Sequence, residues 1–562
     1  PPPAPRPAAI LKETPKESSD NSIISDKATA AFIRRTLCAH HALSGAGEKD
    51  RNSPRPVDEL LPPLTSSNEV DLQLYAIVAV ILKEFVFIWY TKITPDHVFV
   101  DEVIQIVAHC TRALEQRLRK VDLESLLLDE LPQLIDTHLS AFRIAQDSIY
   151  PLPLANTPRE VYHTLTPHPA LSPVPLNADP SSLLELERNE EAWRQLLVQG
   201  VLAVLLPTED LENGCLRTLV TDIFAEMILG NGLSKKACEP WLLWDAITTI
   251  IEATHPRTGA KNVEKVQPPT TASSRLEQFG LLSGANENMN VSHRFNLKAH
   301  GSAAFSSVSG LFWTVVQYMF LAFTAGRIVI YTLATSSTMP SRSKTWLSPV
   351  EAERQDILFP PKARSNSHTS SASLANNQRP ILDMAVWPMM AHLIEINVRM
   401  PWLSGMLALL QHGALFGPGR VGDTDGALDR LLSNYVRAHM LNPAYIPKLL
   451  RIVRATLFPN NQPGPPRKIP SAIEVVAIKR RCAETIASVL PPPVGARIFA
   501  LQGVDLDTRA EALVKEIEGL LDILSDSYMN RHLVFGIVEL VVVRFLPELG
   551  EKGVGELMRD RL

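Results

Sequence analysis

The sequence predicts an all-α fold, and three observations support this prediction. Apolar residues recur at helical spacing over long blocks of the chain, and the strict alternation that is typical of strands is almost absent. The 44 prolines of the 562-residue chain cluster between these blocks, so they separate helical parts from Pro/Ser-rich connectors. Hydrophobic residues make up 45% of the chain, which is enough to bury a core and excludes global disorder.

The charge balance and the cysteines exclude several classes of protein. Lys and Arg together number 55 and Asp and Glu 60, so the formal net charge of −5 argues against nucleic acid as a partner. The five cysteines are odd in number and widely spaced, which favours a reducing, cytoplasmic compartment over a secreted disulfide scaffold. The chain begins Pro-Pro-Pro without Met, which is compatible with a native membrane anchor before residue 1.

The first helical part covers residues 58–255. Ser67 is a suitable N-cap for its first long helix. The apolar run that follows is interrupted by Lys83 and Glu84, and adjacent charges are costly in a bilayer, so we expect a buried core helix. Residues 151–180 contain eight prolines, which predicts a linker on the surface of this part.

The remaining segments alternate between connectors and helices. We expect disorder through most of residues 1–57 and through 335–380, because their composition cannot bury enough apolar surface to offset chain entropy. On this reasoning, 335–380 is dispensable for folding. The other expected parts are a linker, an apolar helical segment, a Met-rich helical segment, a C-terminal helical part and a tail, which cover 256–302, 303–334, 381–429, 430–550 and 551–562, respectively.

The stretch 311–334 is long enough to span a bilayer. It contains Gln317 and Arg327, however, and a central Arg costs about 2.5–3.5 kcal/mol on insertion scales. We therefore expect a buried or lipid-facing helix here instead of a membrane span.

No motif in the chain assembles an active site or a metal site. Residues 417–422 match the glycine pattern of dinucleotide-binding loops, but a helix precedes them and the acidic Asp423 and Asp425 follow, so we interpret them as an ordinary loop. Cys38-Ala39-His40-His41 lacks a second cluster that would complete a metal site. The sequence therefore predicts a protein that is not an enzyme, with no catalytic residues, metal or cofactor.

Methionine is concentrated between positions 384 and 406, where Trp387 and Trp402 also lie. Met is flexible and polarizable, and it suits surfaces that accept variable apolar shapes. Two interpretations remain open, a simple core stripe and the wall of an adaptable apolar cavity.

Two groups of motifs resemble known families. Residues 87–96 with Phe99, and then 126–132, 138–143 and 215–241, resemble the PXA (phox-associated) domain over about residues 58–255. Residues 441–443, 457–461, 497–502 and 545–549 resemble the Nexin-C domain of sorting nexins. We find neither a PX nor an RGS domain between residues 255 and 430, so the chain is similar to fungal PXA proteins that lack both.

The resemblance implies that the PXA and Nexin-C parts pack together around a shared hydrophobic tunnel suited to acyl chains. It further implies a lipid-binding or lipid-transfer protein that binds phospholipid or fatty-acyl ligands and is peripheral to endoplasmic reticulum or endosomal-vacuolar membranes, acting at endomembranes or membrane contact sites. The alternatives are a helical tether or adaptor without lipid transfer and, disfavoured by the missing nucleophile motif, a lipid hydrolase. The oligomeric state is left open.

The candidate site residues follow from this hypothesis. We expect the cavity to be lined by apolar side chains of the 303–334 segment, the Met-rich segment and the last long helix, namely Phe312, Trp313, Phe320, Phe323, Met389, Met390, Trp402, Met406, Phe535, Val538 and Val542. A phosphate at the rim needs cationic donors. The weaker candidates for that role are Lys92, Arg119, Lys120 and Arg143.

Overall fold

The computed structural model describes residues 26–38, 57–94, 98–147, 157–175, 179–254, 379–458, 461, 470–499 and 506–562, with single positions between 316 and 342. The chain divides into two compact units, of which the first comprises residues 1–248 and 339–562 and the second comprises residues 249–338. The expectations for the 256–302 linker, for most of 1–57 and 335–380, and for Phe312 and Trp313 fall outside the described residues.

Every regular element in the described part of the chain is helical, which confirms the all-α prediction. The elements before residue 255 are α2 (Asp26–Leu37), α4 (Val57–Leu60), α5 (Asn68–Ile81), the π-helical η1 (Leu82–Phe87), α6 (Ile88–Ile93), α7 (Val98–Leu118), α8 (Leu123–Ser125), the π-helical η2 (Leu126–Glu130), α9 (Leu131–Gln146), α10 (Pro158–Leu165), the 3-10 helix η3 (Pro169–Leu171), α11 (Pro180–Leu205), α12 (Thr208–Glu212), α13 (Gly214–Asp222), the π-helical η4 (Ile223–Ala237) and α14 (Pro240–Thr254).

The elements after residue 380 form the second half of the first unit. They are the 3-10 helix η6 (Ile381–Asp383), α19 (Val386–Leu393), α20 (Ile396–Arg399), α21 (Pro401–Phe416), α22 (Ala427–His439), α23 (Tyr445–Leu457), α24 (Ala472–Val489), α25 (Pro492–Ile498), α26 (Leu506–Leu520), the 3-10 helix η8 (Leu521–Leu524), α27 (Ser527–Phe545), α28 (Glu548–Glu551) and α29 (Val554–Arg561).

Several helix starts follow directly from local sequence. Helix α5 begins immediately after Ser67, as predicted, although the serine side chain makes no capping hydrogen bond. Helix α10 begins with a capping box in which Thr157 and Glu160 satisfy each other's backbone N–H groups. Asp526 caps α27 by accepting hydrogen bonds from the backbone N–H groups of residues 528 and 529.

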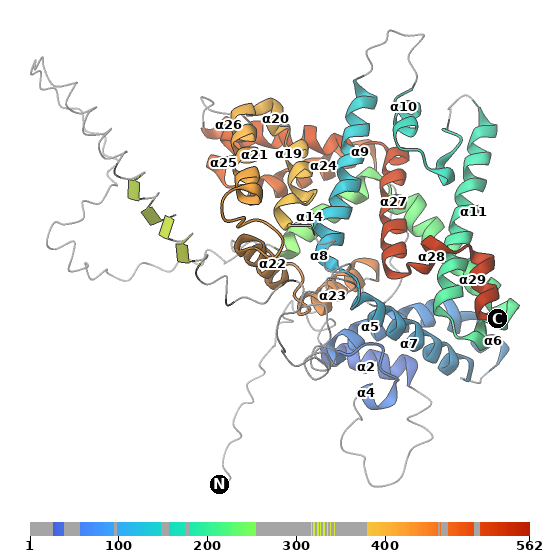
Figure 1. Cartoon of the computed structure of the whole chain (residues 1–562). Helices are drawn as coiled ribbons and strands as arrows, with labels where there is room; N and C mark the ends of the chain where they lie inside the picture. Colours follow the sequence, from blue (N-terminus) through green and yellow to red (C-terminus); the bar gives the residue numbers. More distant parts are fainter. Residues whose placement is uncertain are drawn as a thin grey trace, which may run out of the picture. The chain divides into compact units, whose positions relative to one another are not determined.

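The N-terminal and C-terminal helical parts pack against each other within the first unit. Helix α5 lies against α2 and α23, α9 lies against α19 and α27, and α11 lies against α29 (Figure 1). At one of these contacts, Phe142 and Tyr162 from the N-terminal part share a core with Met529 and Phe535 of α27. The prediction that the two parts form one packed structure is confirmed, whereas the tunnel between them stays a prediction.

The expectation of a linker over 151–180 is partly wrong. Helix α10 and η3 lie within this range, and they bury Tyr162 and Leu171 almost completely. Prolines mark the first residues of both elements, where the missing N–H costs nothing. The high proline content therefore suggested a linker in a range where two short helical elements belong to the core.

The structure adds detail to two further expectations at the C-terminal side. The apolar stretch that begins at residue 381 is broken into four elements, because Glu395 adopts a left-handed backbone conformation (φ 54°) and Pro401 starts a new helix. The expected tail at 551–562 contains helix α29, which packs on α11. Arg561 donates hydrogen bonds to the carbonyls of Ala203 (2.9 Å) and Val204 (2.7 Å).

Candidate functional site

One candidate site of the first unit lies on three consecutive helices, α19, α20 and α21. We call the exposed large hydrophobic side chains of these helices the apolar surface. Its members are Trp387, Met390, Val398, Trp402, Met406, Leu407, Leu409, Leu410 and Phe416, with exposed fractions between 45% and 82%. Exposed apolar side chains that gather on neighbouring helices are candidates for an interaction site.

This surface carries almost no charge. Between residues 384 and 416, Glu395 and Arg399 are the only side chains of the Asp, Glu, Lys and Arg types. They pair with each other at 3.4 Å. Arg143 also lies 3.1 Å from Glu395, and Glu516 lies 2.9 Å from Arg399, so both charges are compensated. The helices therefore present an uncharged face to their surroundings.

One side of helix α21 is hydrogen-bonded to neighbouring segments of the chain. The side chain of Gln411 donates a hydrogen bond to the carbonyl of Leu382 (2.6 Å), and the N–H of Gly422 donates to the carbonyl of Ala414 (2.9 Å). Leu415 is the residue of this helix that is buried. Most of the remaining apolar side chains of α21 are exposed, so the helix has polar anchors on one side and an apolar outer face.

The length of α21 limits what this face can do. A helix of its 16 residues extends about 24 Å, which is less than the roughly 30 Å of a bilayer's hydrocarbon core. Throughout the described part of the chain, no helix combines the length and the apolarity needed to cross a membrane. The apolar surface is therefore suited to contact one side of a membrane, an acyl chain or another apolar surface.

The predicted cavity residues are distributed over several places. Met390, Trp402 and Met406 belong to the apolar surface, and their neighbour Met389 is buried. In the second unit, Phe320 and Phe323 occupy helical positions and are 70% and 68% exposed.

The candidates on α27 lie in a different setting. Phe535 is fully buried and stacks on Trp193 with ring centroids 4.3 Å apart, whereas Val538 and Val542 are half-buried. Phe535 therefore belongs to the core shared by α9, α10 and α27. The structure also contains a small pocket of about 110 Å³ elsewhere, lined by Val57, Leu61 and Tyr75 among others.

The predicted headgroup cations lie in different surroundings. Lys92 and Lys120 are exposed. Arg119, immediately after the end of α7, pairs with Glu115 of that helix at 2.8 Å. Arg143 donates hydrogen bonds to the carbonyls of His392 (2.6 Å) and Leu393 (3.2 Å) at the end of α19. In the structure Arg143 thus ties α9 to α19, the first of the three helices that carry the apolar surface, a role that sequence reasoning did not anticipate.

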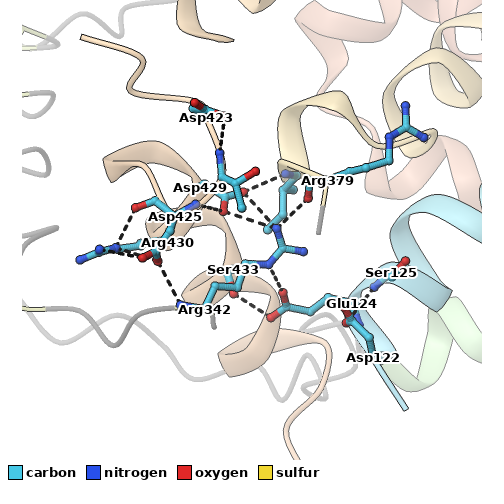
Figure 2. A network of polar contacts seen from close by, with 12 residues as sticks. Asp122, Glu124, Ser125, Arg342, Arg379, Asp423, Asp425, Asp429, Arg430 and Ser433 are labelled. Atoms are coloured by element: carbon cyan, nitrogen blue, oxygen red, sulfur yellow. Dashed lines mark hydrogen bonds and ion pairs between the residues drawn. The ribbon is translucent and has the colours of Figure 1, made fainter. Parts of the chain in front are cut away.

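A second site, missed by sequence reasoning, is a buried ion-pair network that joins the two helical parts (Figure 2). Arg342 Nε lies 2.8 Å from Glu124 Oε2 of α8, and Arg342 Nη1 lies 3.4 Å from both carboxylate oxygens of Asp429 of α22. The three side chains are exposed by 1% or less. Figure 2 shows the Arg342 guanidinium lying between the two carboxylates.

Further hydrogen bonds complete this network. Ser433 donates to Glu124 at 2.7 Å, and Arg437 pairs with the same carboxylate. The N–H of Ile381 donates to Asp429 at 2.8 Å. Buried carboxylates are tolerated when they are paired and hydrogen-bonded, and both conditions are met here. Arg342 comes from the range that we expected to be disordered, so no sequence signal identified it.

The described residues contain no group of three or more His, Cys, Asp or Glu side chains placed to hold a metal ion. The arrangement of the two sites thus offers apolar contact at α19–α21 and a buried polar joint between the helical parts.

Comparisons with known proteins identify one domain of the chain. Residues 67–250 match the family model of the PXA domain, and this match lies within the 58–255 range expected from the sequence. The chain is 30% identical to PXA domain protein 1 of Schizosaccharomyces pombe over 141 residues, which cover 24% of this chain and 25% of that protein.

Two sorting nexins are also similar. Sorting nexin-14 of Danio rerio is 27% identical over 111 residues, covering 19% of this chain and 12% of the relative. Sorting nexin-13 of Homo sapiens is 24% identical over 172 residues, covering 30% and 17%, respectively. The matched stretch thus spans a quarter or less of the length of these relatives. No solved structure matches the chain.

Proposed function

We propose that this PXA-domain-containing chain is a membrane-associated protein that binds lipid acyl chains and acts at endomembranes or their contact sites. Its relatives include proteins named sorting nexins, which supports a role in membrane trafficking or its regulation. The single observation that carries the proposal is the uncharged, exposed apolar surface on α19–α21. The mechanism is non-covalent, and no step requires a catalytic residue.

The physical reasoning starts from burial. Each methylene group that an acyl chain buries against protein contributes about 0.8 kcal/mol. Met390 and Met406 provide flexible side chains that adapt to chains of different shape, while Trp402 at the start of α21 has the amphipathic ring that favours membrane interfaces. Phospholipid or fatty-acyl ligands therefore match the chemistry of this surface.

A helical tether or adaptor that holds a membrane without moving lipid is the second candidate. The observation in its favour is that Trp402, Met406 and other members of the apolar surface face outward instead of enclosing a cavity. Such a face can bind a bilayer directly. Retention and transfer of lipid by the purified protein distinguish the two candidates.

The experiment uses the full chain in three assays: flotation with neutral phosphatidylcholine vesicles, mass spectrometry of co-purifying lipid, and transfer of labelled phospholipid between vesicles. Leu409→Glu and Leu410→Glu place a charge on side chains that are 74% and 62% exposed, so the fold should be retained. Leu184→Glu on α11, also 62% exposed, is the matched control.

We expect the parent protein and the Leu184→Glu control to float with vesicles and to carry lipid, and both surface variants to lose at least tenfold in vesicle affinity. Circular dichroism confirms folding of each variant. Flotation of the parent without co-purifying or transferred lipid would favour the tether. Flotation of all variants alike would exclude the apolar surface as the membrane contact.

A further inference from the structure

A cluster of histidines lies at the contact between the N-terminal part and α27. His138 of α9, His163 of α10 and His168 just before η3 surround His532 of α27. The ring of His532 lies with its centroid 5.3 Å from that of His163 and 6.2 Å from that of His168. Tyr162 is 5.1 Å away in an edge-on arrangement. Four titratable rings thus occupy one joint between segments distant in sequence.

A neutral ring satisfies both hydrogen bonds of His138. Its Nε2 lies 3.1 Å from the carbonyl oxygen of Ile523, which only accepts, so Nε2 carries the proton. The Nδ1 atom then accepts from the Tyr162 hydroxyl at 2.7 Å. This tautomer follows from the partners. Burial lowers the pKa of His138, and the hydrogen bond to Ile523 offsets only part of that effect.

His532 has the least favourable surroundings for a charge. It is 6% exposed, and neither ring nitrogen makes a hydrogen bond of ordinary geometry. Burial and, to a lesser extent, the neighbouring His163, His168 and His138 lower the pKa of His532 to about 3, with the backbone of Thr166 offsetting part of the effect. Burial and His168 also lower the pKa of His163.

The other ionisable groups around His532 form hydrogen bonds or ion pairs with residues other than His532. The Tyr528 hydroxyl donates a hydrogen bond to the carbonyl of Leu171 at 2.8 Å. His163 Nδ1 lies 3.2 Å from the Tyr528 oxygen and therefore donates a hydrogen bond to that oxygen. Arg531 pairs with Glu190 of α11 at 2.6 Å.

Two other pairs flank the cluster. Glu539 of α27 lies 3.4 Å from His168 Nε2 and accepts a hydrogen bond from Trp193 of α11 at 2.7 Å. Arg159 of α10 pairs with Asp526 at 2.9 Å. The carboxylate that faces the cluster is thus committed to His168, and His532 has no opposite charge in contact within the described residues.

We infer that this histidine cluster is an acid-sensitive joint, which holds α10 and η3 against α27 at neutral pH and releases them when the surroundings acidify. His138, His163 and His532 are neutral in the closed joint and gain hydration and protons when it opens. This device is independent of lipid binding at α19–α21, so it stands or falls separately from the proposed function.

Proton linkage gives the direction and size of the effect. A histidine whose native pKa lies below its unfolded value of about 6.5 binds more protons in the open form, so opening becomes favourable as the pH falls below 6.5. Each such histidine shifts the opening equilibrium by up to about tenfold per pH unit between 6.5 and its native pKa. Because the pKa values of His138, His163 and His532 are all lowered, the opening equilibrium of the joint should depend steeply on pH as the solution is acidified.

Hydrogen exchange of the full chain between pH 7.5 and 5.0, corrected for the intrinsic exchange rate, tests this inference. Carboxylates with ordinary pKa values remain mostly ionised over this range. The reporting peptides cover 158–171 and 527–545. The reference peptides cover α24 and α26, which pack on each other and contain no histidine. We expect the opening constant of the reporting peptides to rise at least tenfold from pH 6.5 to 5.5, with the reference peptides changing by less than about threefold.

Two variants test whether His532 causes the pH dependence of the opening constant. His532→Phe keeps a ring of similar size and removes the titrating group, so the rise in the opening constant should become at least threefold smaller. His439→Phe on α22, an exposed histidine that stacks on Tyr435, is the matched control and should behave like the parent. Equal pH dependence of the reporting and reference peptides in the parent overturns the inference whether or not either variant folds, as does an unchanged dependence in folded His532→Phe.

Discussion

Arg342 and Glu124 are 218 residues apart in sequence, yet their Nε and Oε2 atoms lie 2.8 Å apart and both side chains are almost completely buried. Asp429 contacts the other side of the same guanidinium. This triad connects three separate stretches of the chain at one point. Because desolvated charges depend on their partners, each member of the triad is a site where a single substitution should affect the whole first unit.

Replacing Arg342 with Met should lower the free energy of unfolding by about 3–5 kcal/mol, because Glu124 and Asp429 then lose a buried partner. Urea denaturation followed by circular dichroism measures the change. Arg480→Met, at an ion pair on the surface of α24, is the control and should leave the midpoint unchanged. A parent-like midpoint for Arg342→Met would show that the triad contributes no stability.

Removal of the whole 335–380 connector should destabilise the chain, because Arg342 lies within it and Arg342 Nη1 donates a hydrogen bond to the carbonyl of Arg379 at 2.8 Å. Replacing all of 335–380 with a Gly/Ser linker should lower the melting temperature by roughly 3–6 °C, following the loss of the triad. Replacing only 345–377 should lower it by about 1 °C at most. Equal melting temperatures for the two variants would contradict the role given to Arg342.

The two helical parts should not fold when they are separated. Helix α27 covers the N-terminal side chains around Phe142, and α23 lies on α5, so each fragment would expose apolar surface that the intact chain buries. Expression of 58–255 and 430–550 as separate chains should give insoluble or dye-binding material. Two soluble fragments with independent cooperative melting transitions would show that the joint is not required.

Cys215 should be the cysteine that reacts fast with a thiol reagent in the folded chain. It is exposed, whereas Cys38, Cys238 and Cys482 are buried and Cys110 is half-buried. Burial raises the pKa of Cys110 to about 11 and that of Cys238 to about 12, which suppresses the reactive thiolate.

Colorimetric thiol titration should therefore count about one rapid thiol per native chain and five after denaturation. The Cys215→Ser variant should lose the rapid phase. A rapid phase that survives in Cys215→Ser would mean that another cysteine is reached from solvent.

Membrane binding through the apolar surface should depend little on salt or on lipid charge. Only the paired Glu395 and Arg399 are charged between residues 384 and 416, so screening has almost nothing to weaken. Vesicle affinity should change by less than about twofold between 50 and 500 mM NaCl and between neutral and anionic vesicles. A tenfold loss at high salt would instead indicate binding through the exposed cations, with Lys92 and Lys120 as the first candidates.

Local signals in the sequence were sufficient for the fold class and for several boundaries. Ser67 marks the start of α5, and the Lys83–Glu84 interruption correctly argued against a membrane span, because helix capping and the cost of charge act over a few residues. Long-range pairing has no such local signature. Arg342 lies in a polar, Ser-rich stretch, and its carboxylate partners are identified only when three distant segments meet.

For the candidate site, too, the sequence predicted some features and could not predict others. The concentration of Met and Trp around residues 384–406 lies on the helices that carry the apolar surface, but composition does not tell whether a side chain faces inward or outward. Met389 is buried and Met390 is 45% exposed, although they are adjacent. Phe535 satisfied the same apolar criterion and packs instead on Trp193, because α27 fills the gap between α9, α10 and α11.

The pairing of α9 with α27 has a consequence for how the chain is made in the cell. About 400 residues separate the end of α9 from the end of α27, and at about 5–20 residues per second a ribosome needs about 20–80 s to produce them. During that interval Phe142 and its neighbours have been synthesised without the helix that covers them. The nascent N-terminal part should therefore be a client of ribosome-associated chaperones until residue 545 has emerged.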